Sequence, residues 1–510
     1  MSEIQGEVKK ENYMAQSFYV RNGKIKGTSK RDKIIWKGQW DWQRPLTVKA
    51  GKGSDIINFA ASYFNKNKLY GEAGNDKILG GTKADYINGG IGNDTLLGNS
   101  GDDQIHLGYG YDLADGGNGD DKIWCEKGVN AVTGGSGHDT IYGGVGYDAI
   151  DGGKGNDIIF LKKVTKNYKS IKLKLGSKTV NLSEKLRTYV IAGVGHDKIL
   201  DIQGGAIVYG GVGMDTITAI SGNNTLYGGA SNDSITGGTG NDYIDGGDGR
   251  DVIIAKGGDN TIFGGASNDS IKSGKGNDFI DGGIGEDTII AQGGDNTILG
   301  GASNDTITAG YGNDSIDGGD GRDIIVANGG NNTIYGGGSN DSITAGDGDD
   351  VIYGNAHSDT INAGGGTNTI GFNPGDGYDV IISGGGDDNL LFADETFDTC
   401  HAKYSDNGLD LILKTDNGKN TVVLQDFAKG HSVKKVSLGS ITYSIEELLP
   451  PSASLSLAPK TMARNVESLV SDVASWSSST SDYSALPDYA GCQVASTEDI
   501  AQLYINNQPY

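Results

Sequence analysis

The chain has 510 residues, of which 87 are Gly and 7 are Pro, with 35% hydrophobic residues and a formal net charge of −24. Ordering Gly loses more backbone entropy than ordering any other residue, so this chain needs an unusual source of stabilising energy. Low hydrophobicity with high net charge is otherwise typical of disorder. The acidic balance argues against nucleic acid as a partner, because phosphate binding needs Lys and Arg. It favours divalent cations.

Three cysteines, Cys125, Cys400 and Cys492, lie far apart and are odd in number. They form neither a disulfide framework nor a zinc signature. No segment approaches the roughly 18 apolar residues of a membrane helix, so we expect no membrane span. Residues 1–33 lack the apolar run of a signal peptide. An export address, if there is one, is expected elsewhere in the chain.

Residues 1–50 are predicted to form an N-terminal cap. They carry Trp36, Trp40 and Trp42, a cluster that could bind a glycan but more often covers the end of a folded domain. The stretch GTSKRDKII (Gly27–Ile35) has the pattern of a decayed copy of the repeats that follow, which favours the cap.

Residues 51–160 contain nonapeptide repeats such as GGIGNDTLL (Gly89–Leu97). The sixth position of these repeats is Asp in all but one case, and the residue two positions later is apolar. A disordered chain has no reason to keep this register, so we predict an ordered repeat array. The sixth positions of this first roll are Asp76, Asp85, Asp94, Asp103, Asp112, Asp121, Asn130, Asp139, Asp148 and Asp157.

The register is lost in a Lys-rich insert, residues 161–191, and returns in a second roll, residues 192–368. In the second roll, near-copies of 36 residues, each four nonapeptides long, follow one another. Fixed self-similarity of this kind indicates stacked repeats. The copies begin at Thr225, Thr261, Thr297 and Thr333.

Over residues 51–379 these repeats resemble the RTX (repeats-in-toxin) nonapeptide GGxGxDxUx, in which U is a large apolar residue. The resemblance implies an all-β fold, a parallel β-roll solenoid of two stacks split by the insert, with a β-rich C-terminal cap. In that family the first six residues form a turn and the last three a strand, so two repeats make one 18-residue coil. Ca²⁺ lies between stacked turns, bound by sixth-position carboxylates and turn carbonyls.

The residues agree with calcium as the cofactor, in multiple copies. Ca²⁺ prefers 6–8 oxygen ligands, and stacked carboxylates about 4.8 Å apart would repel by about 3.5 kcal/mol at an effective dielectric near 20. We therefore expect the roll to unfold without metal and to fold with it. The expected ligands are the nine Asp of the first roll and, in the second, Asp197, Asp215, Asp233, Asp242, Asp251, Asp269, Asp278, Asp287, Asp305, Asp314, Asp323, Asp341, Asp350 and Asp359.

The two edges of the second roll differ. Every eighteenth residue from Asp197 to Asp359 is Asp, and we name this row the all-Asp edge. The row from Ala206 to Asn368, the mixed edge, alternates Asn and Asp from Asn224 onward. We expect the all-Asp edge to bind calcium tightly and the mixed edge weakly or incompletely. The alternative is that duplication of the 36-residue repeat copied one neutral substitution.

Residues 369–449 have longer alternating strands and are similar to the β-rich segment that follows the repeats in haemolysin-type RTX proteins. Such a segment would cover the open sheet edges of the last coil. Residues 450–510 begin with a Pro450-Pro451 break and are Ser-rich. Because RTX proteins are exported by type I machinery that reads an uncleaved C-terminal segment, this tail is the predicted secretion signal.

No HExxH or GxSxG motif is present and the six His are scattered, so we do not expect an enzyme. The favoured hypothesis is a secreted, extracellular structural protein of the cell surface or matrix, such as an adhesin or surface-layer component. Its partners would be calcium, the type I machinery and a cell surface or glycan. The alternative is an accessory calcium-binding module of a toxin or exoenzyme whose active part is another chain. Ice binding, known among RTX proteins, needs an aligned Thr and Asn ladder, which the third turn positions do not form.

Overall fold

A computed structural model of the chain describes residues 24–35, 45–63, 66–161, 171–175, 178–182, 188–382, 384–415 and 420–449. The tryptophan cluster of the predicted N-terminal cap and the tail after residue 449 lie outside these residues. In the described part of the chain no helix is long and apolar enough to cross a membrane. The chain divides into two compact units, residues 1–174 with 178–275 and residues 175–177 with 276–510, which we describe separately.

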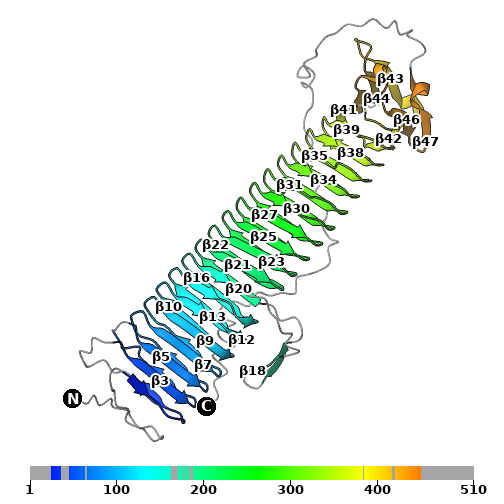
Figure 1. The fold of residues 1–510 in the computed structure, drawn as a ribbon. Helices are drawn as coiled ribbons and strands as arrows, with labels where there is room; N and C mark the ends of the chain where they lie inside the picture. Colours follow the sequence, from blue (N-terminus) through cyan, green and yellow to red (C-terminus); the bar gives the residue numbers. More distant parts are fainter. Residues whose placement is uncertain are drawn as a thin grey trace, which may run out of the picture. The chain divides into compact units, whose positions relative to one another are not determined.

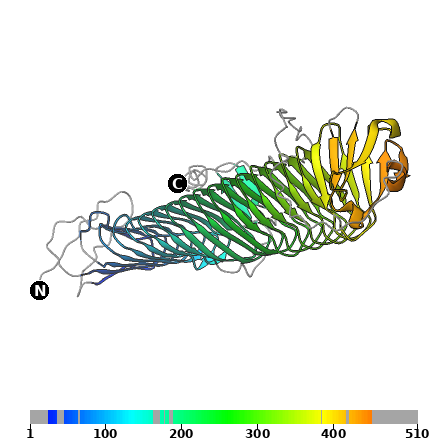
Figure 2. The ribbon, with the colours of Figure 1, turned by 90° about the horizontal axis from the view of Figure 1, so that it is seen from above.

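The first unit consists of short strands that alternate between two parallel sheets and stack as rungs (Figures 1 and 2). One sheet contains β1 (Lys24–Lys26), β3 (Thr47–Lys52), β5 (Lys68–Ala73), β7 (Tyr86–Ile91), β9 (Gln104–Gly110), β11 (Lys122–Trp124), β12 (Lys127–Gly128), β14 (Thr140–Tyr142), β15 (Val145–Gly146), β17 (Ile158–Phe160), β21 (Lys198–Gln203), β23 (Thr216–Ser221), β25 (Ser234–Thr239), β27 (Val252–Gly257) and β29 (Ser270–Lys272). The other contains β2 (Lys33–Ile35), β4 (Ile56–Asn58), β6 (Lys77–Leu79), β8 (Thr95–Leu97), β10 (Leu113–Asn118), β13 (Ala131–Ser136), β16 (Ala149–Lys154), β20 (Thr188–Val194), β22 (Ala206–Val212), β24 (Thr225–Ala230), β26 (Tyr243–Asp248) and β28 (Thr261–Ala266).

The apolar eighth position of each nonapeptide forms the core. Ile87 pairs in register with Ile105 of the next coil, and Ile105 pairs with Ile123. All three side chains are fully buried. Successive side chains of a strand point to opposite faces, so the residues on either side of each Ile lie on the outer face. β-branched residues suit such a stacked, half-buried surface, which explains why Ile dominates this position.

The Lys-rich insert does not interrupt the roll. β16 pairs directly with β20, with Ile150 opposite Val190, and β17 pairs with β21. Within the insert, β18 (Ile171–Leu175) and β19 (Lys178–Leu182) form a separate two-stranded sheet. The two stacks expected from the sequence are thus continuous across the insert, because β20 and β21 pair directly with β16 and β17.

The roll also begins earlier than the nonapeptide register suggests. Ile25 and Ile34 are buried, β1 pairs with β3, and β2 pairs with β4. The backbone N–H of Asp32 donates to Asp55 Oδ1 at 2.6 Å. The stretch Gly27–Ile35 therefore supplies the turn and second strand of the first described coil.

Aromatic side chains form a ladder on the outer face of one sheet in the first unit. The rings of His106 and Trp124 stack with centroids 4.3 Å apart, and Trp124 and Tyr142 stack at 5.3 Å. Tyr142 and Phe160 continue the ladder at 5.2 Å. Near-parallel rings in neighbouring coils cover one another's faces, so the ladder contributes to cross-strand stability.

The second unit continues the same two-sheet pattern and ends in a cap. One sheet contains β31 (Thr288–Ile290), β33 (Thr306–Thr308), β35 (Ile324–Val326), β37 (Ser342–Thr344), β39 (Thr360–Asn362), β41 (Gly377–Ile382), β43 (Cys400–Tyr404), β44 (Leu411–Thr415) and β45 (Asn420–Leu424). The other contains β30 (Phe279–Ile284), β32 (Thr297–Ala302), β34 (Ser315–Asp320), β36 (Thr333–Gly338), β38 (Val351–Ala356), β40 (Thr369–Phe372), β42 (Asp388–Phe392), β46 (Val433–Leu438) and β47 (Ile441–Ser444). Three short 3₁₀ helices, η1 (Phe397–Thr399), η2 (Phe427–Lys429) and η3 (Ile445–Leu448), lie in the cap.

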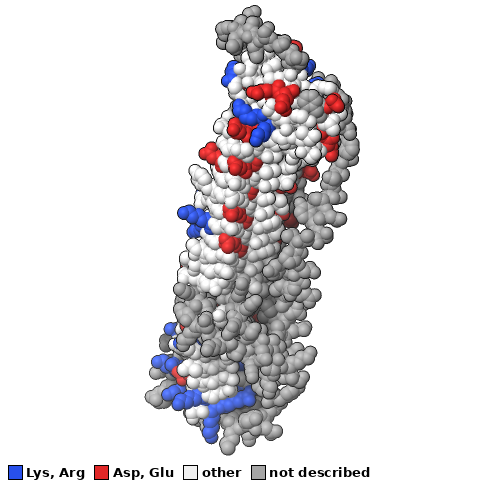
Figure 3. Space-filling model, turned by 90° about the vertical axis from the view of Figure 1, so that its right-hand side faces the viewer, with Lys and Arg blue, Asp and Glu red and all other residues white. Residues whose placement is uncertain are grey.

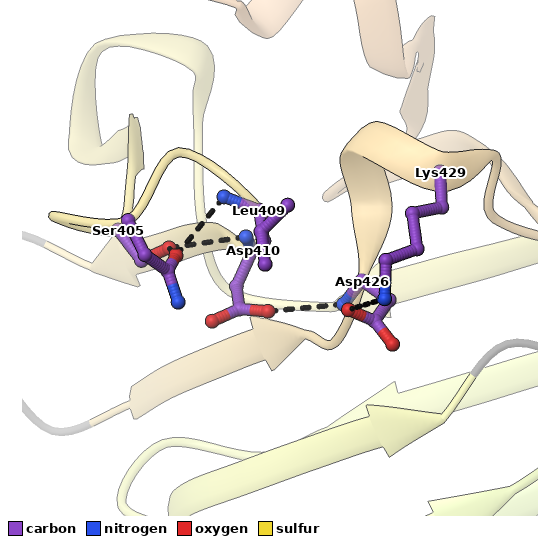
Figure 4. Close-up of polar contacts among 6 residues, drawn as sticks. Ser405, Leu409, Asp410, Asp426 and Lys429 are labelled. Carbon is purple, nitrogen blue, oxygen red and sulfur yellow. Dashed lines mark hydrogen bonds and ion pairs between the residues drawn. The ribbon is translucent and has the colours of Figure 1, made fainter. Parts of the chain in front are cut away.

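The cap changes the strand direction. β44 is antiparallel to both β43 and β45, and β47 is antiparallel to β46. At the β43–β44 turn the backbone N–H of Asp410 donates to Ser405 Oγ at 3.0 Å (Figure 4). The Asp410 carboxylate accepts the backbone N–H of Asp426 at 3.0 Å, and Lys429 pairs with the Asp426 carboxylate at 2.9 Å. These contacts join the hairpin to the loop that leads into η2.

Two adjacent glycines in the second unit, Gly337 and Gly338, differ in how closely the preceding coil approaches them, so substitutions at these positions test how the coils stack. Gly337 has φ +109° and a Cβ there would collide with the carbonyl of Gly319 in the preceding coil. Gly338 has open space, since its nearest neighbour would be Asp320 Oδ1 at 3.5 Å. We expect Gly337→Ala to lower the free energy of unfolding by at least about 1–3 kcal/mol. Gly338→Ala should stay within about 0.5 kcal/mol of the wild type. Urea unfolding of both variants in calcium measures this, and equal effects would contradict the described turn.

Candidate metal-binding edges

The structure places the predicted ligands at one equivalent position of successive turns, directly before a strand. All 23 are buried. Four further Asp lie at the same position, and the nonapeptide register missed them because their spacings to the stacked neighbour are 23, 21 and 20 residues. These four are Asp32, Asp55, Asp379 and Asp388.

Within each unit, one carboxylate oxygen of a stacked Asp accepts a backbone hydrogen bond from the preceding coil. In the second unit the backbone N–H of Asp305 donates to Asp323 Oδ1 at 2.7 Å, and that of Asp323 donates to Asp341 Oδ1 at 2.8 Å. In the first unit the backbone N–H of Asp215 donates to Asp233 Oδ1 at 2.7 Å. This contact holds each carboxylate between two turns.

The other carboxylate oxygen has no hydrogen-bond donor in most of these turns. Within the described residues this holds, among others, for Oδ2 of Asp305, Asp323 and Asp341. A buried acceptor without a donor is destabilising, and a buried charge without a partner more so. Burial therefore favours a cation beside this row of oxygen atoms.

Carbonyl oxygens lie next to these unpaired atoms. A Cβ built on Gly336, the first position of its turn, would lie 2.6 Å from Asp341 Oδ2 and 2.6 Å from the carbonyl oxygen of Gly354 in the next coil. Glycine leaves this space between a carboxylate and a carbonyl open. Ca²⁺ binds carboxylate and carbonyl oxygens at about 2.3–2.6 Å. In the described part of the chain no three His, Cys, Asp or Glu side chains gather as a metal site, so turn carbonyls would supply much of the coordination.

Burial and stacking also raise the pKa of the carboxyl groups. Burial, together with repulsion from Asp359 and Asp323, raises the pKa of Asp341 to about 8. Burial and the charges of Asp215 and Asp251 raise the pKa of Asp233 to about 7. Without a metal, the surroundings of these stacked Asp carboxyl groups therefore disfavour their ionised form at neutral pH. A bound divalent cation favours the ionised form instead, because it interacts with the carboxylate charge.

Two predicted ligands differ from the rest. Oδ2 of Asp85 accepts the backbone N–H of Gly81 at 2.7 Å, and Oδ2 of Asp148 accepts that of Gly144 at 2.9 Å. In these two turns both carboxylate oxygens have backbone donors. Asp85 and Asp148 therefore lack the unpaired oxygen seen at sites such as Asp305, Asp323 and Asp341, as does Asp32, whose Oδ2 accepts the backbone N–H of Thr28 at 2.6 Å.

Because the sixth-position carboxylates are buried, much of the formal charge of −24 lies inside the turns. On the face shown in Figure 3, most of the atoms that are not grey are white and therefore belong to uncharged residues, and Asp and Glu side chains form only short columns. The negative charge is thus concentrated where a bound cation would neutralise it.

Comparison with known proteins agrees with this geometry. The family model of the RTX calcium-binding nonapeptide repeat matches overlapping stretches within residues 70–161 and 209–370. The chain belongs to the RTX calcium-binding repeat family. It is a calcium-binding repeat protein, and its parallel β-roll is the fold that the repeats predict.

Other comparisons add little. No curated protein sequence matches the chain. Among solved structures, the chain is similar to "a hyperactive, Ca2+-dependent, beta-helical antifreeze protein from an Antarctic bacterium". The match has 16% identity, covers 80% of this chain and 97% of that protein, and has a TM-score of 0.23. At these values it carries no argument about this RTX chain.

The raised pKa values predict how pH affects the RTX roll in a chelator. A carboxyl whose pKa is higher in the folded than in the unfolded chain stabilises the fold below the unfolded value and loses this contribution as pH rises through the folded value. For Asp233, Asp341 and Asp103 the folded values are about 7, 8 and 9, against 3.8. With chelator present, we expect more β circular dichroism at about pH 5.5 than at about pH 8.

Light scattering must accompany this measurement, because the sequence pI of about 4.6 favours association in acid. Addition of Ca²⁺ at the higher pH should restore the signal. Equal signals at both pH values in chelator would contradict the electrostatic description of the turns.

Proposed function

We propose that this RTX protein is secreted in an unfolded form and folds on Ca²⁺ outside the cell, where it acts as a structural protein of the cell surface or matrix. The observation that carries the proposal is the row of buried Asp Oδ2 atoms without donors, bordered by turn carbonyls. Each such atom opposes folding until a cation binds beside it.

The compartment follows from the same energetics. A chain whose folded state requires many bound calcium ions remains unfolded where calcium is scarce and folds where it is plentiful. Type I export of an unfolded chain fits this dependence, and the family resemblance supports it. The parallel strands that pair in register in the described part of each unit favour a repeated structural surface, and so an adhesin or surface-layer role, over the alternative of an accessory toxin module.

Calcium should drive folding cooperatively. In chelator at neutral pH we expect a largely disordered circular dichroism spectrum, and millimolar Ca²⁺ should induce the β signal. Mg²⁺ should substitute poorly, because it requires a smaller octahedral shell and gives up its water reluctantly. A chelator-resistant, fully folded protein at neutral pH would refute the proposed function.

Export should depend on the C-terminal tail. Deletion of residues 452–510 should retain the protein inside the cell, while calcium-induced folding of the purified, truncated chain stays intact. Cell fractionation with quantitative blotting measures the first effect, and circular dichroism provides the control. Unchanged secretion of the truncated chain would show that the export address lies elsewhere.

A further inference from the structure

The mixed edge contains a second way of joining stacked turns. In the second unit the side-chain amide of Asn332 donates to the carbonyl of Gly330 in its own turn at 3.0 Å. It also donates to Oδ1 of Asp350 in the next coil at 2.9 Å, and it lies 3.5 Å from the carbonyl oxygen of Ala345. One nitrogen thus contacts a carboxylate and two turn carbonyls.

The same contacts recur in other coils of this edge. The Asn296 amide donates to the Gly294 carbonyl and to Asp314 Oδ1, both at 2.9 Å. In the first unit the Asn224 amide contacts the Gly222 carbonyl and Asp242 Oδ1, both at 2.9 Å, and the Gly237 carbonyl at 3.2 Å. The arrangement is therefore a property of the repeat and not of one turn.

The amide nitrogen stands where the all-Asp edge has an unpaired oxygen. Oδ1 of Asn332 accepts the backbone N–H of Asp314 at 3.0 Å, as Oδ1 of Asp323 accepts that of Asp305. The remaining atom at the turn is Nδ2 in Asn332 and Oδ2 in Asp323. An Oδ2 beside carbonyl and carboxylate oxygens needs a cation, whereas an NH₂ group supplies two donors to the same oxygens.

The residue at the first position of the turn also differs between the two edges. In the second unit the all-Asp edge has Gly at this position, and Gly336 leaves open the space beside Asp341 Oδ2. The mixed edge has buried alanines there, in its Asn turns and in its Asp turns alike. These are Ala291, Ala309, Ala327, Ala345 and Ala363.

The electrostatic surroundings of the Asp carboxyl groups also differ between the two edges. The pKa of Asp341 on the all-Asp edge is raised by burial and by its two stacked neighbours, Asp359 and Asp323. For Asp242 on the mixed edge burial raises the pKa, and the hydrogen bonds from Asn224 lower it. The Asn coils thus separate the carboxylates of this edge, and their amides donate to the following Asp242, Asp314 and Asp350.

We propose that the Asn amides of the mixed edge replace calcium ions, so that the coils at Asn224, Asn296 and Asn332 are joined without metal. The inference rests on the proposed calcium-dependent folding. Asp314 and Asp350 retain an Oδ2 without a donor, while the turn between them carries the amide of Asn332. On the all-Asp edge the successive turns of Asp305, Asp323 and Asp341 each have such an oxygen. Calcium loading of the roll is therefore asymmetric.

The test gives one turn of the mixed edge the residues of an all-Asp turn, in the full-length chain. The double variant Ala327→Gly/Asn332→Asp restores the glycine and the carboxylate of an all-Asp turn. We expect it to bind about one additional Ca²⁺ in isothermal titration calorimetry and equilibrium dialysis, and to need more calcium for half-maximal folding. Asn332→Leu removes the amide without adding a carboxylate, so it should destabilise the roll and bind no additional ion.

The mirror variant is Asp323→Asn on the all-Asp edge, with Asp323→Ala as its matched control. We expect Asp323→Asn to lose about one ion and still fold in calcium, because the new amide can bridge the same oxygens. Asp323→Ala should lose the ion and require more calcium to fold. Folding is read by circular dichroism, so loss of an ion and loss of structure are separated.

The outcomes distinguish this inference from the proposed function. If the wild type binds no calcium and folds in chelator, the proposed function itself is wrong. If the wild type binds calcium but Ala327→Gly/Asn332→Asp gains no ion, the Asn coils already hold metal and only the amide replacement is overturned. Equal behaviour of Asp323→Asn and Asp323→Ala would overturn it as well.

Discussion

The constraint on which the structure depends is the stacking of carboxylates at successive turns. The sixth-position Asp side chains are buried, and most of them accept a hydrogen bond from the backbone of the preceding coil, as Asp233 and Asp341 do. That hydrogen bond sets the coil register and leaves the second oxygen without a donor in most turns. The carboxylate that orders the backbone is thus the same one that offers an oxygen to a cation, which supports the proposal that folding and metal binding are coupled.

Other contacts of the RTX roll surround the stacked carboxylates or join the coils beside them. Ile side chains fill the narrow core between the two sheets, and glycine at the first turn position leaves space beside the carboxylate. The aromatic ladder from His106 to Phe160 adds contacts between coils that require no metal. Asn amides join turns on the mixed edge. A roll built in this way contains both metal-dependent and metal-independent contacts between coils.

The periodic sequence predicts the all-β roll, its register and the stacking of the sixth-position carboxylates, because a fixed repeat places identical contacts in every coil. Where the spacing departs from eighteen residues the prediction fails. Asp55 stacks on Asp76 across 21 residues, and Asp379 follows Asp359 after 20. These spacings hide both residues from a search by period, although the structure gives them the same hydrogen bonds.

Other features depend on backbone geometry that residue types do not reveal. Asp85 and Asp148 fit the nonapeptide pattern, yet their turns direct a backbone N–H at the second carboxylate oxygen. The insert reads as a break in the sequence, but β16 and β20 pair across it. The alternation of Asn and Asp is visible in the sequence. Its consequence, an amide within reach of three oxygens, becomes visible only when the coils are stacked.

The most direct test of the central claim is a crystal structure of the calcium-bound protein with anomalous diffraction that locates each ion. We expect calcium peaks beside Oδ2 of Asp305, Asp323 and Asp341, with turn carbonyls among the ligands. A refined roll with these carboxylates in place and no ion beside them would contradict the account.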